Sequence, residues 1–198
     1  ARSTLMTGLH TGHTPVRGNT GGIPLPADAT CLAQVLREAG YATGGFGKWG
    51  LGDLDTEGVP EKHGFDTFFG YYHQIHAHDY YPEYLIRNSE KVPLPGNAGR
   101  DKKTYSHYRI EEETRKFIRE HRDGPFFCYA AWTPPHGKYV IPQSDPAWRQ
   151  YKDKDWEHKA RVVAAMNTML DRQVGGLLDL LDELDIAENT LVVFCSDN

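Results

Sequence analysis

The sequence predicts an α/β fold, a three-layer sandwich in which helices cover a mainly parallel sheet. Two kinds of segment alternate along the chain. One is the short apolar run, of which residues 125–132 (PFFCYAAW) are the clearest case, and the other carries apolar residues at three- and four-residue steps. Continuous apolar runs suit strands covered on both faces, as in parallel sheets. Their alternation with amphipathic helices favours the sandwich.

Length and composition limit the classes of protein that the chain can represent. Its 198 residues and 22.4 kDa suffice for one domain with a sizeable core. Because 39% of the residues are hydrophobic, a disordered or low-complexity chain is excluded. Lys and Arg number 22 against 27 Asp and Glu, and this acidic balance argues against a nucleic-acid partner. No apolar run reaches 18 residues, so we expect no membrane-spanning helix.

The first half of the chain predicts two helices, a strand and a glycine-rich loop. Residues 2–8 form a short helix ended by glycine, and Thr30 caps a second helix that ends at Gly40. Residues 41–46 form a strand, and the loop 47–52 follows it. The three cysteines (Cys31, Cys128 and Cys195) are too widely spaced for a zinc knuckle, and we expect small buried side chains.

The second half predicts a hairpin over residues 84–93, a surface helix over 107–121 and a long helix over 157–184. Residues 191–194 predict a further strand. The inward positions of the surface helix are Ile110, Thr114, Phe117 and Ile118. The stripe of the long helix, which we expect to be core, comprises Val162, Met166, Met169, Leu170, Val174, Leu177, Leu178, Leu181 and Leu184.

Polar residues follow three of the predicted strands. Open α/β sheets place their ligand-binding and catalytic residues at this end of the strands. Lys48 lies among glycines that let an anionic ligand approach, although a solvated turn lysine fits the same pattern. His136 follows two prolines that fix the backbone, and its imidazole can donate a proton or bind an anion unless it is an ordinary loop histidine. Asp197 and Asn198 offer the oxygen ligands that Ca²⁺ and Mg²⁺ prefer, or form a turn or helix cap.

Two further groups have weaker signals. Arg2, in the first turn of a helix, can bind a tetrahedral anion or lie on the surface. His73, His76 and His78 stand among tyrosines, where a sugar-binding wall or loop packing is favoured over a metal site, which needs a longer-range ligand.

These motifs, taken in order, resemble the formylglycine-dependent sulfatases of the alkaline-phosphatase-like superfamily. ARSTLMTGLHTGH is similar to the segment that begins inside the signature C-x-P-[SA]-R. The G-K-W loop, the P-P-H loop, the D-x-x-V-G-x-L-L helix at residues 171–178 and the terminal S-D-N are also sulfatase-like. HAHDYYPEYLIRN looks most like bacterial members that act on sulfated polysaccharides.

The resemblance implies hydrolysis of sulfate esters by a formylglycine made from the signature cysteine, whose hydrate attacks sulfur. Arg2 would stabilise that hydrate, and Lys48 would bind sulfate. His136 would contact the sulfate and help to protonate the leaving oxygen, and we place His78 with the substrate-binding residues. The metal ligands Asp197 and Asn198 would bind calcium, with the remaining ligands outside this chain.

Departures from the family pattern lead to an expectation of incompleteness. The signature cysteine, the first strand with its acidic metal ligands and a C-terminal subdomain are absent from residues 1–198, which we interpret as a single partial catalytic domain, inactive by itself. Gly50 stands where many relatives have a histidine credited with sulfate elimination, a role that another histidine such as His78, or water, would have to take.

Two alternatives remain open: a phosphoryl or phosphonate hydrolase of the same superfamily, and a degenerate sulfatase-like domain that binds glycans. The main interpretation predicts a small-molecule or oligosaccharide sulfate ester as partner. The family resemblance also suggests a periplasmic or secreted protein.

Overall fold

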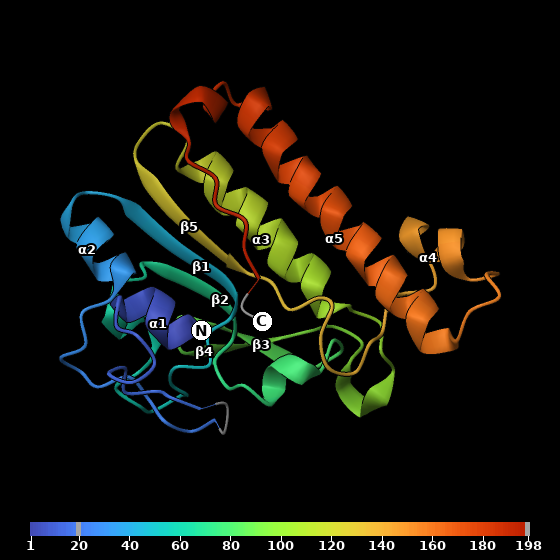
Figure 1. The fold of residues 1–198 in the computed structure, drawn as a ribbon, viewed down its shortest axis with the longest axis horizontal. Coiled ribbons are helices and arrows are strands. Elements are labelled where there is room, and N and C mark those ends of the chain that lie inside the picture. The colour runs from blue at the N-terminus through green and yellow to red at the C-terminus, as the bar shows by residue number, and fades with distance from the viewer. Residues whose placement is uncertain (19–20, 197–198) are drawn as a thin grey trace.

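A five-stranded sheet lies at the centre of the molecule, in the order β4-β3-β2-β1-β5. The computed structural model describes residues 1–18 and 21–196 (Figure 1). The strands are β1 Ala42–Lys48, β2 Thr67–Tyr71, β3 Tyr84–Arg87, β4 Glu90–Pro93 and β5 Phe126–Ala131. The helices are α1 Arg2–Thr7, α2 Leu32–Glu38, α3 Ser106–Glu120, α4 Pro146–Tyr151 and α5 His158–Glu183, with short 3-10 turns η1 Pro60–His63, η2 His76–His78, η3 Ala98–Arg100 and η4 Ala187–Asn189.

The sheet has a parallel core and an antiparallel edge. Strand β1 pairs in parallel with β2 on one side and with β5 on the other. Strands β3 and β4 form the predicted hairpin, which extends the sheet in antiparallel fashion beyond β2. The carboxyl ends of β1, β2 and β5 therefore meet at one edge, which is where the sequence places its polar groups.

Alternation along the strands creates two apolar faces. Phe68 packs with α1 and α2 residues such as Met6 and Ala33, whereas the next residue, Phe69, packs with Ile110 and Phe117 of α3. Side chains of consecutive strand residues point to opposite faces, so one strand serves both cores. Helices on both faces of the sheet confirm the predicted three-layer α/β sandwich.

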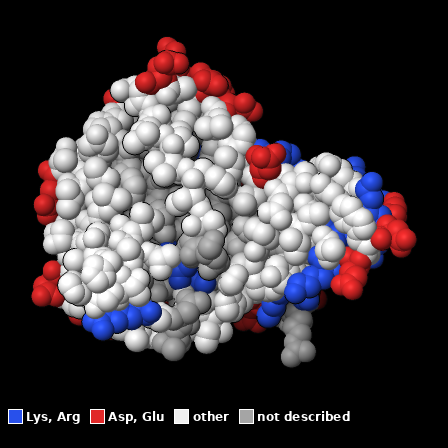
Figure 2. Space-filling view, viewed as in Figure 1, with Lys and Arg blue, Asp and Glu red and all other residues white. Residues whose placement is uncertain are grey.

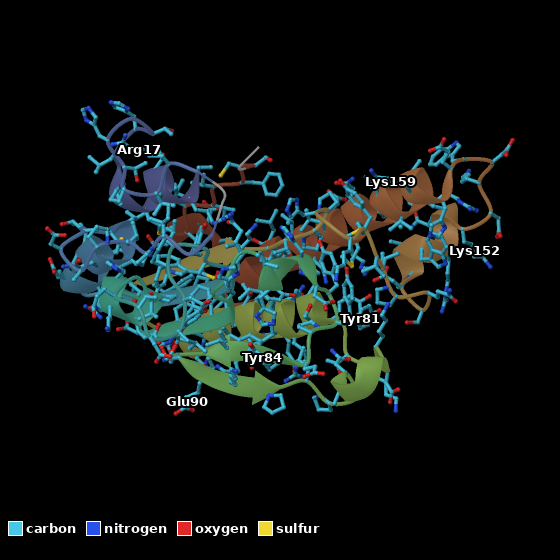
Figure 3. All side chains as sticks on the ribbon, turned by 90° about the horizontal axis from the view of Figure 1, so that it is seen from below. Arg17, Tyr81, Tyr84, Glu90, Lys152 and Lys159 are labelled. Carbon is cyan, nitrogen blue, oxygen red and sulfur yellow. The ribbon has the colours of Figure 1, made fainter. Side chains whose placement is uncertain are left out.

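Helix α5 packs on the outer side of α3, and α4 packs on α5 (Figure 1). Asp145 joins these helices: it caps α4 by accepting from the Ala147 N–H at 2.7 Å, and it accepts hydrogen bonds from Arg172 of α5 and Tyr108 of α3. Figure 3 shows this end of the molecule, marked by Lys152, far from the loop that carries Arg17.

A glycine permits the strands to converge just before Lys48. Gly47 has φ +118°, and a Cβ there would lie 2.1 Å from the carbonyl oxygen of Ala131 on β5. No side chain fits that gap, and the backbone conformation is one that other residues rarely adopt. The glycine-rich sequence before Lys48 therefore lets the ends of β1 and β5 approach closely.

Several sequence-based expectations need correction. Residues 191–194 form no strand and are half or more exposed, since among the described residues the sheet ends at β5 and these residues are not paired with it. The α2 helix is capped at Cys31 rather than Thr30. Cys195 is exposed rather than buried, and in the α5 stripe Leu178 is 44% exposed while Leu180 is buried instead.

Strand β5 is half-buried rather than covered on both faces, because it forms an edge of the sheet in the part of the chain that the structure describes. Helix α3 buries all four of its predicted inward positions. Within residues 1–18 and 21–196, no helix combines the length and the apolar character needed to cross a membrane.

Candidate active site

Lys48 is the last residue of β1 and is only 7% exposed. The residues after it are tightly held: the Trp49 N–H donates to Tyr71 O at 2.9 Å, and the Gly50 N–H donates to Tyr72 O at 2.8 Å. The buried Trp49 indole also donates to Gly58 O at 2.6 Å. The ammonium of Lys48 therefore extends from a fixed main chain at the carboxyl edge of the sheet.

Arg2 reaches this same edge from α1. Its Nε donates to the carbonyl oxygen of Trp49 at 2.8 Å, and its Nη2 donates to Oε1 of the buried Gln74. The guanidinium is thus fixed next to the residue that follows Lys48. Figure 2 shows Lys or Arg atoms in a hollow near the centre of one face, where Figure 1 shows the start of α1.

A side chain at Gly50 would have to displace the ends of two neighbouring side chains. Its φ is +70°, and a Cβ there would lie 2.8 Å from Nη2 of Arg2 and 3.0 Å from Oε1 of Gln74. The Arg2–Gln74 pair therefore occupies the space next to Gly50, the position at which the sequence pattern places a histidine in relatives. Gly50 has no side chain that could act in place of that histidine.

His78 and His136 form a pair. The two Nε2 atoms lie 3.3 Å apart, and the ring centroids lie 5.0 Å apart. His78 ends η2, and His136 lies in the loop after β5. Tyr80 fixes the main chain of His136 on both sides, because its hydroxyl donates to His136 O at 3.0 Å and accepts from His136 N at 3.2 Å.

The surroundings of His78 disfavour its charged form. Burial lowers its pKa below the usual value, and the positive charges of Lys48, His136 and Lys138 lower it further. Two facing Nε2 atoms can share a hydrogen bond only when one carries a proton and the other does not. A hydrogen bond between these atoms would thus place one proton between two imidazoles, within the electrostatic range of the Lys48 ammonium.

The other two histidines of the cluster have different surroundings. His76 packs against Tyr71 and Tyr84, with ring centroids 5.2 and 4.8 Å apart, and burial lowers its pKa. His73 accepts a hydrogen bond from the Ile75 N–H through Nδ1. Among the described residues, no group of three or more His, Cys, Asp and Glu side chains could hold a metal ion.

The predicted calcium ligands Asp197 and Asn198 lie outside the described residues. Their chemistry fits calcium, since a carboxylate and an amide supply the hard oxygen atoms that this ion prefers. Two ligands are fewer than the six to eight that calcium takes, so further oxygen ligands are needed.

The structure thus brings the sequence-predicted residues into two contacting groups. In the first group, Arg2 contacts Trp49, the residue after Lys48. In the second group, His78 contacts His136, and the positive charge of Lys48 lowers the pKa of His78. Sequence reasoning missed Gln74 and the role of Tyr80. Gln74 meets Arg2 across 72 positions of the chain, a separation about which local sequence patterns say nothing.

The parallel-centred sandwich, with cationic and imidazole groups at its carboxyl edge, defines an open α/β protein whose candidate site lies where such sheets place their ligands. The comparison with known families identifies the class further, because the sulfatase family model matches residues 1–198. The chain therefore belongs to the sulfatase family.

Individual relatives are sulfatases, in agreement with the family model. The chain is 30% identical to human N-acetylgalactosamine-6-sulfatase over 90% of its own length and 34% of that protein's, and 31% identical to bovine arylsulfatase A over 96% and 41%. Mouse arylsulfatase J is 28% identical over 100% of the chain and 34% of that protein. The chain thus spans between a third and two fifths of these relatives.

Solved structures share the fold. The structure of yidJ from Bacteroides fragilis superposes with a TM-score of 0.76 at 22% identity, covering 96% of this chain and 49% of that one. Ps i-CgsB, solved in complex with k-i-k-neocarrahexaose, has a TM-score of 0.70 at 25% identity, covering 93% and 44%. The alkaline-phosphatase-like fold class predicted from the sequence is confirmed.

Proposed function

We propose that the chain supplies the sulfate-binding and proton-transferring groups of a sulfate ester hydrolase that acts on sulfated carbohydrate. The observation that carries the proposal is the His78–His136 pair next to the buried Lys48. A buried ammonium attracts a sulfate group, and an imidazole pair with one shared proton suits the departure of an alcohol. Ps i-CgsB, a structure of the same fold, was solved with k-i-k-neocarrahexaose, which supports the carbohydrate part.

Each side chain has a distinct task in this proposal. Lys48 neutralises negative charge on the sulfate oxygens, and its fixed main chain means that little reorganisation is needed during reaction. His136 donates the proton at Nε2 to the leaving oxygen, and His78, whose Nε2 lies 3.3 Å from that nitrogen, keeps the imidazole oriented. His78 also lies close enough to contact the substrate.

The family cofactors fit the chemistry of these residue types. The Arg2 guanidinium would hold a formylglycine whose position we place three residues before Ala1, and Asp197 with Asn198 would contribute to a calcium site completed by residues outside this chain. Calcium would add positive charge next to the sulfate oxygens. The proposal therefore includes a longer parent protein, of which residues 1–198 are part of the catalytic domain. Placing it in the periplasm or outside the cell rests on the family resemblance.

Hydrolysis of a chromogenic aryl sulfate by the parent protein tests the activity. We expect turnover of the aryl sulfate to exceed that of the matching aryl phosphate. Preference for the phosphate would support the phosphoryl hydrolase instead. Oligosaccharide binding without turnover of either ester would support a glycan-binding domain. The 198-residue chain alone should neither hydrolyse the ester nor bind calcium with micromolar affinity in calorimetry.

A further inference from the structure

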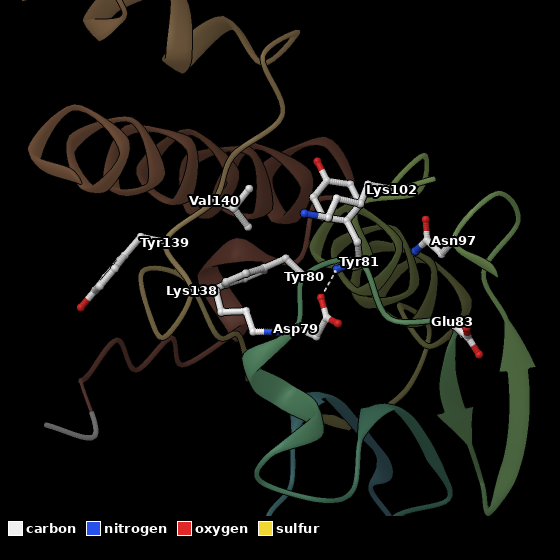
Figure 4. Close-up of a pocket in the computed structure, with 9 residues that line it drawn as sticks. All are labelled: Asp79, Tyr80, Tyr81, Glu83, Asn97, Lys102, Lys138, Tyr139 and Val140. Carbon is white, nitrogen blue, oxygen red and sulfur yellow. Dashed lines mark hydrogen bonds between the residues drawn. The ribbon is translucent and has the colours of Figure 1, made fainter. Parts of the chain in front are cut away.

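A cavity of about 460 Å³ lies among segments that continue the chain from the histidine pair (Figure 4). Its volume lies within the range of sites that bind small molecules. It is lined by Asp79, Tyr80, Tyr81, Glu83, Asn97, Lys102, Lys138, Tyr139 and Val140. None of these residues has a task in the proposed sulfate chemistry except Tyr80, which holds His136.

The cavity continues the site through the chain itself. Asp79 follows His78, and Lys138 follows His136 by two positions. The segment that carries Lys138 packs against His78, since a Cβ on Gly137 would lie 3.6 Å from the Cβ of His78. A substrate whose sulfate ester reaches the histidine pair would therefore place its neighbouring atoms in this cavity.

Hydrogen bonds fix the cavity walls. Tyr80 stacks on Tyr105 with ring centroids 5.4 Å apart, and the Tyr105 hydroxyl donates to Val140 O at 2.9 Å. Asn97 is buried, and its amide donates to Pro82 O and Thr104 O, both at 2.8 Å. These contacts hold the three segments that form the walls in a preformed arrangement.

The side chains at the cavity suit a sugar with a negative charge. Tyrosine rings provide apolar faces, and the carboxylates of Asp79 and Glu83 accept hydrogen bonds from hydroxyl groups. Asp79 is already oriented, because one of its oxygens accepts from the Tyr81 N–H at 3.0 Å. Lys102 and Lys138 add two ammonium groups from different segments (Figure 4). The lining therefore offers carboxylates to the hydroxyl groups of a sugar and ammonium groups to an anionic group on it.

We propose that this cavity binds the sugar unit next to the reacting sulfate ester, and that Lys138 and Lys102 there bind a second anionic group, a sulfate or a carboxylate, on the same substrate. The inference rests on the proposed function for the position of the reacting ester. It narrows the substrate class to oligosaccharides with at least two negative groups.

Binding of a reaction product tests the inference separately from catalysis. The parent protein is titrated by calorimetry with carrageenan and glycosaminoglycan disaccharides that lack the reacting sulfate, in three forms: with a second sulfate, with a carboxylate, and with neither. We expect the better of the two anionic forms to bind at least about tenfold more tightly than the neutral form, and the difference between sulfate and carboxylate identifies the group.

The variant Lys138→Ala should reduce that preference about tenfold, and Lys138→Arg should retain it. Lys102→Ala should act in the same direction. Lys152→Ala, an exposed lysine on the distant α4 end, serves as the matched control and should leave the affinities unchanged. Equal affinities of wild type and Lys138→Ala for the anionic form, or no preference over the neutral form in wild type, would overturn the inference. An inactive parent that shows the preference would contradict the proposed function and leave the cavity assignment standing.

Discussion

The two halves of the candidate site are held in different ways. Lys48 and Arg2 are anchored to the end of β1, where the main chain is hydrogen-bonded to β2 and Arg2 binds the carbonyl oxygen of Trp49. His78 and His136 instead lie on a 3-10 turn and a loop, and they are held by each other and by Tyr80. The difference indicates that the cationic half is preformed by the sheet, whereas the imidazole half depends on side-chain contacts.

The largest effect should come from removing the imidazole half. His136→Ala leaves His78 without its partner and removes the proton donor, so we expect kcat on an aryl sulfate to fall about 10²–10⁴-fold in the parent protein. Steady-state kinetics measures this change. Ile75→Ala, at an exposed position near η2, is the control and should retain wild-type kcat. Full kcat in His136→Ala would remove the role assigned to that histidine.

A buried histidine on α3 should make the fold sensitive to acid. His107 of α3 is fully buried against Trp132, its Nε2 lies 2.7 Å from Gln173 Oε1, and burial lowers its pKa to about 4. The unfolded state, with a pKa near ~6.5, binds the proton at higher pH than the folded state does. The contribution of His107 to the free energy of unfolding is therefore fully present above the unfolded-state pKa. It falls by about 3 kcal/mol as the pH decreases toward 4.

Denaturant unfolding of the parent protein between pH 7 and 4 measures this loss. His107→Gln keeps a hydrogen-bond donor toward Gln173 but cannot titrate, so its stability should fall less steeply over the same range. Identical pH dependence in the two proteins would show that His107 is not the acid-sensitive group.

The smallest effect should come from loosening the cationic half, because Arg2 keeps its bond to Trp49 when Gln74 is removed. We expect Gln74→Ala to lower kcat/KM about tenfold, mainly through kcat. This is the effect expected from losing one hydrogen bond to a charged group. Gln74→Glu retains an acceptor for Arg2 and should recover most of the activity. If Gln74→Ala and Gln74→Glu lost activity equally, Gln74 would have no role in positioning Arg2.

Local elements were predictable from the sequence, but the contacts between them were not. Periodicity and glycine punctuation located α1, α3, α5 and the β3–β4 hairpin, because these patterns report on the local backbone. The segment 191–194 has the composition of a strand, yet a strand also needs a hydrogen-bonding neighbour, which composition does not reveal.

The candidate site shows the same limit. Lys48 and His136 were identified because each follows a strand, and Arg2 because it begins a helix. The His78–His136 contact spans 58 positions, and the Arg2–Gln74 contact spans 72. The family resemblance already selected His78 over His73 and His76, but no spacing rule predicts that its ring faces His136, which only the folded arrangement shows.

The central claim is that Lys48 and the His78–His136 pair bind one sulfate group. A crystal structure of the parent protein with inorganic sulfate tests it most directly. The account predicts sulfate oxygens within about 3 Å of Lys48 Nζ and of an imidazole nitrogen of His136. Sulfate bound elsewhere, with Lys48 and His136 directed into separate surroundings, would contradict it.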